Sequence, residues 1–150
     1  MNKQPEYFWN EENGIAFCTI YYNNYSFMGE AQCHPDDRDM MSKLTGQTMA
    51  EMRATIKYLR FIKDCELQPQ LKALKQLYYS MNYSKYFNPK SYEAKMLYRQ
   101  INILKEDLSN INIEISNIKK SLKEYIERKE KDHQKIRELQ NSKHLAESNQ

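Results

Sequence analysis

The chain has little glycine, little cysteine and no long apolar run. Its 150 residues include three glycines, three cysteines and four prolines. The cysteines are odd in number and lack the spacing of a disulfide framework, so a reducing cytoplasm is the expected compartment. The first residues, Met1–Glu6, have no apolar core of the kind that a signal peptide needs, and no apolar stretch approaches the length of a membrane span. We therefore expect a cytoplasmic protein that does not act in a membrane.

Sequence motifs for catalysis are scarce as well. The chain contains no nucleophile elbow, no glycine-rich phosphate loop and no His-x-Glu metal motif. The best candidate for a general acid or base is His34, which stands close to Asp36 and Asp37. A structural explanation is stronger, because Pro35 turns the chain and aspartates commonly cap the segment after a turn. We predict no catalytic residue, no cofactor and no enzymatic activity.

The side chains that could ligate a metal ion are poorly spaced. They are Cys18, Cys33, His34, Asp36, Asp37 and Cys65. Zinc sites usually contain a close ligand pair such as Cys-x2-Cys, and this chain has none. A hairpin that turns at Asn23-Asn24 separates Cys18 and Cys33 by four residues along the sheet, on the order of 13 Å at about 3.3 Å per residue. We therefore predict no metal site.

The N-terminal third has the pattern of an antiparallel sheet. Gly14–Tyr22 and Tyr25–Cys33 are runs rich in residues that favour strands. Asn23-Asn24 between them suits a two-residue hairpin turn, because asparagine tolerates positive φ. Tyr7–Trp9 is a candidate third strand. A lone hairpin is marginal in water, so we expect this sheet to pack on a helix.

Two helices are predicted after the sheet. Thr48-Met49-Ala50-Glu51 matches a helix capping box, and apolar residues recur at helical spacing beyond it. Pro69 falls inside this pattern, so the helix should kink or restart there. Asn88-Pro89 predicts the start of the second helix, with asparagine as the N-cap and proline at the first helical position. The expected fold is α+β, with a sheet and cap segment at 1–48, a kinked helix and tyrosine-rich connection at 49–88, and a long helix with a frayed tail at 89–150.

An apolar residue recurs with alternating steps of three and four from Ala94 to Leu139. This register covers more than six heptads with only Lys129 and Asp132 as polar positions, and it predicts a long helix packed along another helix. If Ser91 to Leu145 is a single helix, it is roughly 80 Å long at about 1.5 Å per residue, more than the core of so small a chain can cover. We therefore expect a homo-oligomer. The positions expected to form it are Leu97, Ile101, Leu104, Leu108, Ile111, Ile115, Ile118 and Leu122.

The charge of the chain is small in total and unevenly distributed. Residues 1–50 hold three basic and seven acidic side chains, a net of −4. Residues 51–100 hold ten basic and four acidic side chains, a net of +6. Residues 101–150 hold ten basic and nine acidic side chains, a net of +1. An anionic partner is expected to dock on the middle third. The excess is too small for a general nucleic-acid binder, which usually has a strongly basic domain.

Two features of the middle third suit an anionic ligand. Three cations stand at i, i+4 and i+7 of the first predicted helix and share one face of it. The connection between the helices interleaves aromatic rings with cations, as base stacking and phosphate binding require. A solvated helix face explains the first feature equally well, and a protein-binding hot spot or a packed helix elbow explains the second. The candidate ligand-binding residues are Arg53, Lys57, Arg60, Tyr83, Phe87, Asn88 and Arg99.

Two resemblances bear on function. The stretch Phe27–Asp37, followed by Gly46 and Ala50–Ala54, resembles small proteins from phages and prophages of Gram-positive bacteria, in which a strand ending in G-x-A-x-C-H-P-D-D precedes a helix with A-x-x-R-A. In architecture the chain also resembles the phage anti-Thoeris sponge proteins. Those proteins have an N-terminal antiparallel sheet and two long, kinked helices, and they assemble as homo-oligomers. They sequester cyclic ADP-ribose-type signals without degrading them, through aromatic stacking and arginines on the helices.

The sponge resemblance implies a set of ligand contacts and a function. By residue type and location the contacts are Phe87, Asn88, Arg99 and Arg53. The implied protein is a non-enzymatic phage anti-defence protein of the host bacterial cytoplasm, whose partners are further copies of itself and a small cyclic nucleotide. One alternative is a direct inhibitor of a host defence protein such as a Cas nuclease. Another is a helical structural protein of the phage particle.

Overall fold

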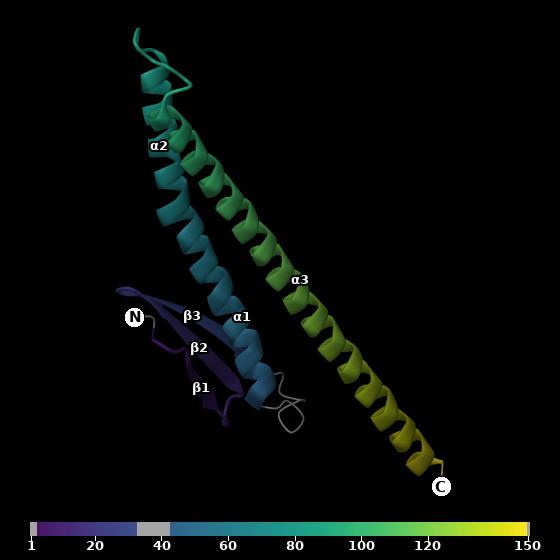
Figure 1. The fold of residues 1–150 in the computed structure, drawn as a ribbon. Coiled ribbons are helices and arrows are strands. Elements are labelled where there is room, and N and C mark those ends of the chain that lie inside the picture. The colour runs from purple at the N-terminus through teal and green to yellow at the C-terminus, as the bar shows by residue number, and fades with distance from the viewer. Residues whose placement is uncertain (1–2, 33–42, 150) are drawn as a thin grey trace. The chain divides into compact units, whose positions relative to one another are not determined.

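The computed structural model of the protein describes residues 3–32 and 43–149. Its elements are β1 (Glu6–Asn10), β2 (Ile15–Tyr22), β3 (Tyr25–Gln32), α1 (Lys43–Phe61), η2 (Ile62–Leu67), α2 (Gln68–Asn82) and α3 (Tyr92–Ser148), shown in Figure 1. They divide into two compact units. Unit 1 is Met1–Thr55 with Ile118–Gln150, and unit 2 is Ile56–Asn117, so α1 and α3 each contribute to both. The predicted α+β class is confirmed.

The three strands form one antiparallel sheet in chain order. Tyr22 pairs with Tyr25 across the β2–β3 turn, where Asn23 has the positive φ of 51° that suits a tight turn. Cys18 stands opposite Gly29, as the predicted hairpin register requires. The predicted third strand is present as β1, so the expected small sheet is confirmed.

The first half of α1 lies against the sheet through small side chains. At Gly29 an added β-carbon would lie 1.9 Å from the Ala50 carbonyl oxygen and 2.5 Å from the Ala54 nitrogen. Only a glycine therefore lets the helix backbone come this close to β3. The sheet packs on a helix, as its small size requires. The buried residues of this contact are Ala16, Cys18 and Ala31 of the sheet and Ala50 and Ala54 of α1, with Trp9, Ile20 and Met49 packed around them.

The start of α1 differs from the prediction. Among the described residues the helix is already formed at Lys43, so the start predicted at Thr48 is too late. The Thr48 hydroxyl does not cap the helix and instead donates to the Leu44 carbonyl oxygen at 2.8 Å. A Thr-x-x-Glu pattern also occurs within helices, because threonine can bond back to the carbonyl four residues earlier. The capping-box prediction is wrong for this reason.

The interruption predicted at Pro69 takes the form of a π-helical segment. η2 separates α1 from α2, and Pro69 lies in the first turn of α2. Proline has no N–H to donate, and the first turn of a helix does not need one. The predicted restart is therefore confirmed, and the widened hydrogen bonding of η2 keeps the chain helical across it.

The long helix is present but is capped by a different residue from the one predicted. α3 is preceded by Ser91, whose hydroxyl oxygen accepts a hydrogen bond from the Ala94 N–H at 3.2 Å. The predicted cap, Asn88, closes the preceding turn by accepting the Lys90 N–H at 3.0 Å. Both residue types are good caps, and the turn at Asn88-Pro89 uses the first of them.

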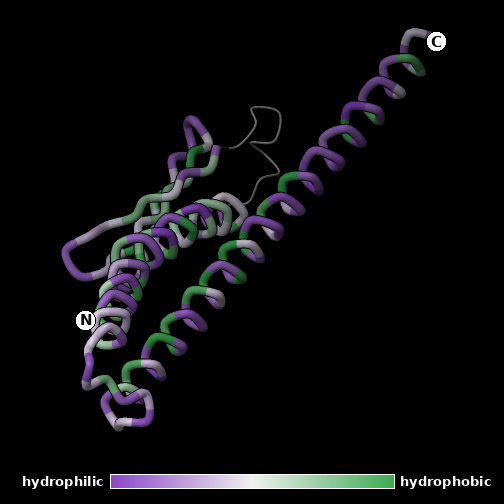
Figure 2. Tube along the Cα trace, turned by 90° about the horizontal axis from the view of Figure 1, so that it is seen from above, coloured by the Kyte–Doolittle hydropathy of each residue, from purple (hydrophilic) through white to green (hydrophobic). Residues whose placement is uncertain are grey.

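The heptad positions form the buried stripe of α3. Within unit 2, Leu97 and Ile101 are buried, whereas Ile103 and Ile113, which lie outside the register, are 49% and 56% exposed. Hydrophobic turns repeat along the helix in Figure 2. The heptad pattern thus identified which face of α3 is turned inward.

The chain itself covers this face of α3 in unit 2. The Tyr98 ring of α3 lies 6.1 Å from the Tyr78 ring of α2. Further along, burial raises the pKa of the Tyr58 phenol of α1, and the nearby Glu66 carboxylate raises it further. The Glu114 carboxylate of α3 is also close enough to contribute. The unit 2 part of the stripe therefore has neighbours within the chain itself, which the expectation of a second copy did not include. Self-association of the chain remains a prediction.

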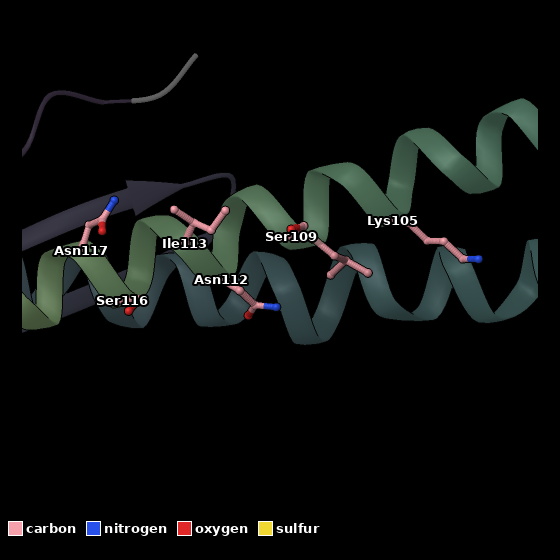
Figure 3. Close-up of a pocket in the computed structure, with 7 residues that line it drawn as sticks. Lys105, Ser109, Asn112, Ile113, Ser116 and Asn117 are labelled. Carbon is pink, nitrogen blue, oxygen red and sulfur yellow. The ribbon is translucent and has the colours of Figure 1, made fainter.

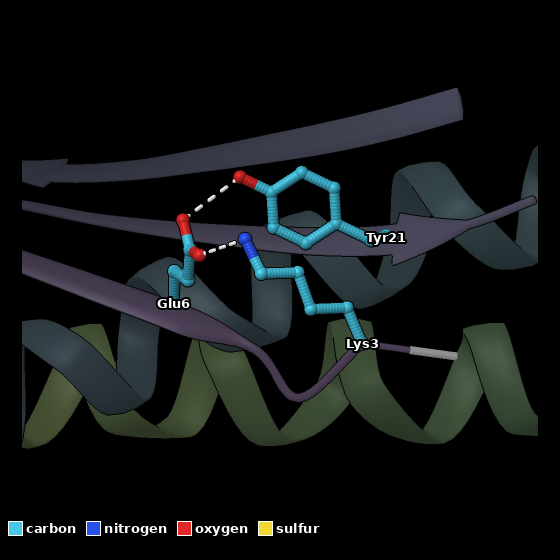
Figure 4. Close-up of polar contacts among 3 residues, drawn as sticks. All are labelled: Lys3, Glu6 and Tyr21. Carbon is cyan, nitrogen blue, oxygen red and sulfur yellow. Dashed lines mark hydrogen bonds and ion pairs between the residues drawn. The ribbon is translucent and has the colours of Figure 1, made fainter. Parts of the chain in front are cut away.

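A small polar cluster lies on the outer face of the sheet (Figure 4). The Glu6 carboxylate pairs with the Lys3 ammonium and accepts a hydrogen bond from the Tyr21 hydroxyl at 2.8 Å. The hydrogen bond from Lys3, then the one from Tyr21, lowers the pKa of Glu6, and the bond to Glu6 raises the pKa of Tyr21. All three groups face water, so the cluster orders the start of β1 and contributes little to stability.

Candidate binding site

The connection between α2 and α3, residues 83–91, is a series of short turns and is called the elbow below. The Phe87 N–H donates to the Ser84 carbonyl oxygen at 3.1 Å, and the Ser91 N–H donates to the Asn88 carbonyl oxygen at 3.0 Å. The Ser84 hydroxyl oxygen also accepts the Tyr86 N–H at 3.3 Å. Serine and asparagine favour such turns because their side chains bond to nearby backbone groups. The elbow is thus built by its own sequence.

One aromatic ring joins the elbow to both helices. The Tyr78 ring lies 5.9 Å from the Phe87 ring, edge-on, and 6.1 Å from the Tyr98 ring. A third ring, that of Tyr79, lies 6.5 Å away. Such separations are those at which aromatic pairs attract one another. Other aromatic residues of the region stay exposed: Tyr83 (92%), Tyr86 (88%) and Tyr92 (73%).

A pocket of about 330 Å³ opens at the elbow. It is lined by Met81, Ser84, Tyr86, Phe87, Asn88, Ser91 and Glu93. Apolar walls with a few polar groups are typical of small-molecule sites, and two aromatic rings, two serine hydroxyls and an amide meet that description. Glu93 brings one negative charge, which suits a hydroxyl or amine of a ligand better than a phosphate.

The pocket brings together only part of the predicted ligand set. Phe87 and Asn88 both line it. Tyr83 is the next residue after α2 and projects into solvent, outside the lining, and Arg99 is exposed on α3. Of the four predicted residues in and beyond the elbow, two therefore share one space.

The basic stripe of α1 is placed elsewhere. Lys57 and Arg60 belong to unit 2 but precede η2 and α2, and Arg60 is 23 residues before the elbow, roughly 35 Å along a helix at about 1.5 Å per residue. Arg53 belongs to unit 1, where its guanidinium donates to the Glu30 carbonyl oxygen of β3 at 2.5 Å. Lys57 and Arg60 are thus far from the elbow along the chain of unit 2, and Arg53 bonds to the backbone at the edge of the sheet in unit 1.

Several residues of the pocket were missed by reading the sequence. Ser84 and Ser91 accept hydrogen bonds from the backbone of the turns and of α3, and Glu93 lies in the first turn of α3. Their second role follows from the fold, because the turns bring their side chains to one side of Phe87. The available signal was the high density of hydroxyl and aromatic residues between two helices.

A larger pocket, of about 520 Å³, follows the side of α3 (Figure 3). Its lining is Lys105, Leu108, Ser109, Asn112, Ile113, Ser116 and Asn117. All of these come from one helix, and Lys105 is the one titratable group among the described residues that line it. General acid–base catalysis needs a proton acceptor within reach of a reacting group, which this lining does not supply. We assign it no chemistry.

The ionisable groups at the sheet–helix contact are held in their neutral forms. Burial, and then the nearby Glu51 carboxylate, raises the pKa of the Cys18 thiol to about 11. Tyr7 is 45% exposed as a whole, but burial, and then a hydrogen bond to Glu51, raises the pKa of its phenol to about 12. A thiol with a raised pKa is a poor nucleophile at neutral pH. These groups are therefore poor candidates for covalent chemistry.

The candidate metal and acid–base residues of the sequence are mostly not described. Cys33, His34, Asp36 and Asp37 lie outside the described residues. Of the other two candidates, Cys18 is buried in β2 and Cys65 is exposed in η2. Within residues 3–32 and 43–149, no three histidine, cysteine or carboxylate side chains gather as a metal site would require.

Two further findings concern the chain as a whole. None of the described helices combines the length and the apolar composition needed to cross a bilayer. Comparison of the chain with models of protein families, with curated proteins and with solved structures finds no match.

Proposed function

We propose that the protein is a non-enzymatic phage anti-defence protein of the host bacterial cytoplasm. It binds and sequesters a cyclic nucleotide-type immune signal of the cyclic ADP-ribose class. The observation that carries this proposal is the elbow pocket, in which Tyr86, Phe87 and Asn88 line a single space of about 330 Å³. That volume lies at the lower end of the range of small-molecule sites.

The groups at the elbow match the parts of such a ligand. An adenine base has a flat face that stacks on an aromatic ring, and Tyr86 offers an exposed one. The Asn88 side chain accepts the Lys90 N–H through its oxygen, which leaves its NH₂ group to donate to a ligand. From Gln68 to Ser91 the chain carries four lysines and no acidic residue. Lys85 and Lys90 of the elbow exceed the single negative charge of Glu93 in the pocket lining, and this excess attracts a diphosphate.

Binding without turnover is favoured by what the pocket contains. Glu93 is the one carboxylate in its described lining, and no second acid or base accompanies it apart from the Tyr86 phenol. Hydrolysis of a phosphate or glycosidic bond usually needs a pair of acid–base groups or a metal ion. A ligand held here would therefore be retained and removed from signalling.

Isothermal calorimetry with cyclic ADP-ribose isomers and with cyclic di- and trinucleotides tests the proposal. We expect at least one cyclic ADP-ribose isomer to bind, and its recovery unchanged from the complex by chromatography. Absence of heat from every nucleotide in the panel would sink the proposal, and conversion of the bound nucleotide would point to an enzyme.

A pair of tyrosine variants locates the site. Tyr86→Ala removes an exposed ring of the pocket, and stacking on one base is worth about 1–3 kcal/mol, so affinity should fall roughly tenfold or more. Tyr25→Ala removes a ring that is 55% exposed in unit 1 and should leave the affinity unchanged. Equal effects of the two variants would place binding outside the elbow.

We also propose that copies of the chain associate through α3, in the part of the helix beyond Tyr125. The Tyr125 hydroxyl donates to the Thr45 hydroxyl at 3.1 Å, inside unit 1. Further along, Leu139 and Leu145 are each 65% exposed although Leu139 keeps the heptad register. Native mass spectrometry should give an oligomer that Leu139→Glu converts to monomer. A monomeric natural chain would contradict this part of the proposal.

The second candidate, a direct inhibitor of a bacterial defence protein such as a Cas nuclease, is favoured by the outer face of the sheet. Phe8 and Met28 are 59% and 51% exposed there, and the Phe17 ring lies 6.1 Å from that of Phe8. Clustered apolar side chains on a surface often mark a protein-binding site. Co-purification of a defence protein that Phe8→Ser abolishes and Tyr86→Ala preserves would favour this candidate over nucleotide binding.

A further inference from the structure

Unit 2 contains a second cavity that the elbow site does not use. It is a groove of about 410 Å³ between one face of α2 and Leu108 of α3. Leu71, Lys72, Lys75 and Tyr79 of α2 line it, with glutamines at positions 68 and 76. No residue is shared with the elbow pocket, so the two spaces are separate. We call it the lysine groove.

The groove carries positive charge, and no acidic side chain is among the described residues that line it. Lys72 is exposed and Lys75 is half-buried, and they stand three residues apart on one face of α2. α2 contains no aspartate or glutamate. Among the described residues neither lysine makes an ion pair. A ligand with negative charge would therefore meet two available ammonium groups, and a positively charged one would be repelled.

The rest of the lining indicates what kind of anion fits. It is mainly apolar, with two half-buried leucines and the Tyr79 ring, which is 59% exposed. Such a surface suits an apolar side chain better than a sugar-phosphate, because a buried polar group needs hydrogen-bond partners. The α2 face from position 68 to Tyr79 is roughly 16 Å long at about 1.5 Å per residue. That span matches about five residues of an extended peptide.

We infer that the lysine groove is a docking surface for an acidic segment of a partner protein. The segment places one apolar side chain against Leu71 and Leu108 and sets carboxylates opposite Lys72 and Lys75. Apolar contact supplies the anchor, and the carboxylate–ammonium pairs select acidic partners and speed their association. The inference goes beyond nucleotide binding at the elbow and does not depend on it.

A defined peptide tests the inference on the full-length protein. The probe is a fluorescent peptide of about twelve residues with a central leucine flanked by glutamates, and fluorescence anisotropy measures its affinity. The double variant Lys72→Glu/Lys75→Glu should weaken binding roughly tenfold or more, as should replacing the glutamates of the peptide by glutamines. The matched control Lys119→Glu/Lys120→Glu reverses two exposed lysines of α3 in unit 1 that precede Tyr125, and it should leave the affinity unchanged.

Chemical shifts of the backbone amides, measured by NMR, complete the test. Addition of the peptide should perturb amides of α2 and those next to Leu108, and Tyr86→Ala should not alter its affinity. The inference is overturned by absence of peptide binding, by equal binding to both lysine double variants, or by shifts confined to other elements. Tighter binding of ADP than of the peptide at these same amides would also overturn it, because the groove would then be a nucleotide site. Cyclic nucleotide binding at the elbow is measured separately, so failure of one proposal is distinguishable from failure of the other.

Discussion

The two units of the chain pack by opposite means. In unit 1 the sheet and α1 meet through alanines, a cysteine and a glycine, all of them buried. In unit 2 the helices meet through leucines, isoleucines and a cluster of rings centred on Tyr78. Small side chains bring backbones close together and leave no tolerance for added volume. Large ones keep backbones apart, and every ring on the surface adds a face that a ligand can use.

The two kinds of packing lead to different expectations for the two units. The sheet–helix contact of unit 1 consists of small buried residues, and its ionisable groups, Cys18 and Tyr7, are held neutral. Unit 2 contains both the elbow pocket and the lysine groove, together with the exposed Tyr83 and Tyr86. We therefore expect substitutions in unit 1 to act on stability first, and those at the surface of unit 2 to act on binding.

The largest effect is expected at Gly29. Gly29→Ala places a β-carbon 1.9 Å from the Ala50 carbonyl oxygen, a distance that forces the helix away from the strand. Overpacking typically costs about 1–3 kcal/mol and more where backbone must move, so we expect a loss of about 3 kcal/mol or more in the free energy of unfolding. Urea denaturation followed by circular dichroism measures it. Ser26→Ala, on an exposed position of the same strand, is the control, and a similar effect of both would refute the tight contact.

A smaller loss is expected at the centre of the aromatic cluster. Tyr78→Ala removes three ring contacts and leaves a gap beside Phe87 and Tyr98, which should cost about 2–3 kcal/mol. Tyr79→Ala removes one edge contact of a ring that is 59% exposed, and should cost under about 1 kcal/mol. Denaturant midpoints of the two variants test the ranking. An equal cost would mean that the rings do not hold unit 2 together.

High pH is expected to lower the stability of unit 1, because the Cys18 thiol then ionises. The pKa of its thiol is about 11 in the folded protein, against 9.0 ordinarily, so its contribution to stability is complete below pH 9 and is lost as pH rises to about 11. A shift of this size is worth about 2.7 kcal/mol. Tyr7, whose pKa is about 12, acts in the same direction above pH 10.

The matching measurement is the free energy of unfolding at several pH values between 8 and about 11.5. Cys18→Ala should be less stable at pH 8 but should lose less on going to high pH. Alkylation mapped by mass spectrometry supplies a second readout: iodoacetamide should modify the exposed Cys65 and spare Cys18 at pH 8. Rapid modification of Cys18 in the folded protein, or parallel pH profiles, would contradict its burial.

The fold could be predicted from the sequence wherever a residue acts through its immediate neighbours. The hairpin register follows from the turn at Asn23-Asn24, and the inward face of α3 follows from the heptads. Boundaries were less predictable, because Thr48 and Asn88 each have an equally good alternative use. The partner of α3 in unit 2 was missed for another reason. A heptad pattern predicts that a helix packs along another helix, but it does not indicate whether that helix belongs to the same chain.

The place where aromatic rings gather was predictable, but the residues that line the pocket there were not. The density of aromatic residues between two helices marked the elbow correctly as a place where rings gather, and Phe87 and Asn88 do share a pocket there. Ser84 and Ser91 join them only because successive turns fold the segment back. The lysine groove was not recognised from the sequence. Lys72 and Lys75 line it together with Leu108, which lies 33 residues after Lys75.

The smallest effect is expected for two arginines of the basic stripe on α1, Arg53 in unit 1 and Arg60 in unit 2. Arg53→Ala removes the hydrogen bond to the Glu30 carbonyl oxygen at the edge of the sheet and should cost about 1 kcal/mol, since the group is only half-buried. Arg60→Ala truncates an exposed arginine in unit 2 and should change the free energy of unfolding by less than about 0.5 kcal/mol. Thermal denaturation of the two variants measures the difference. An Arg53→Ala variant as stable as the natural chain would mean that this arginine is not needed at the sheet edge and is available to bind a ligand, as its place in the stripe first indicated.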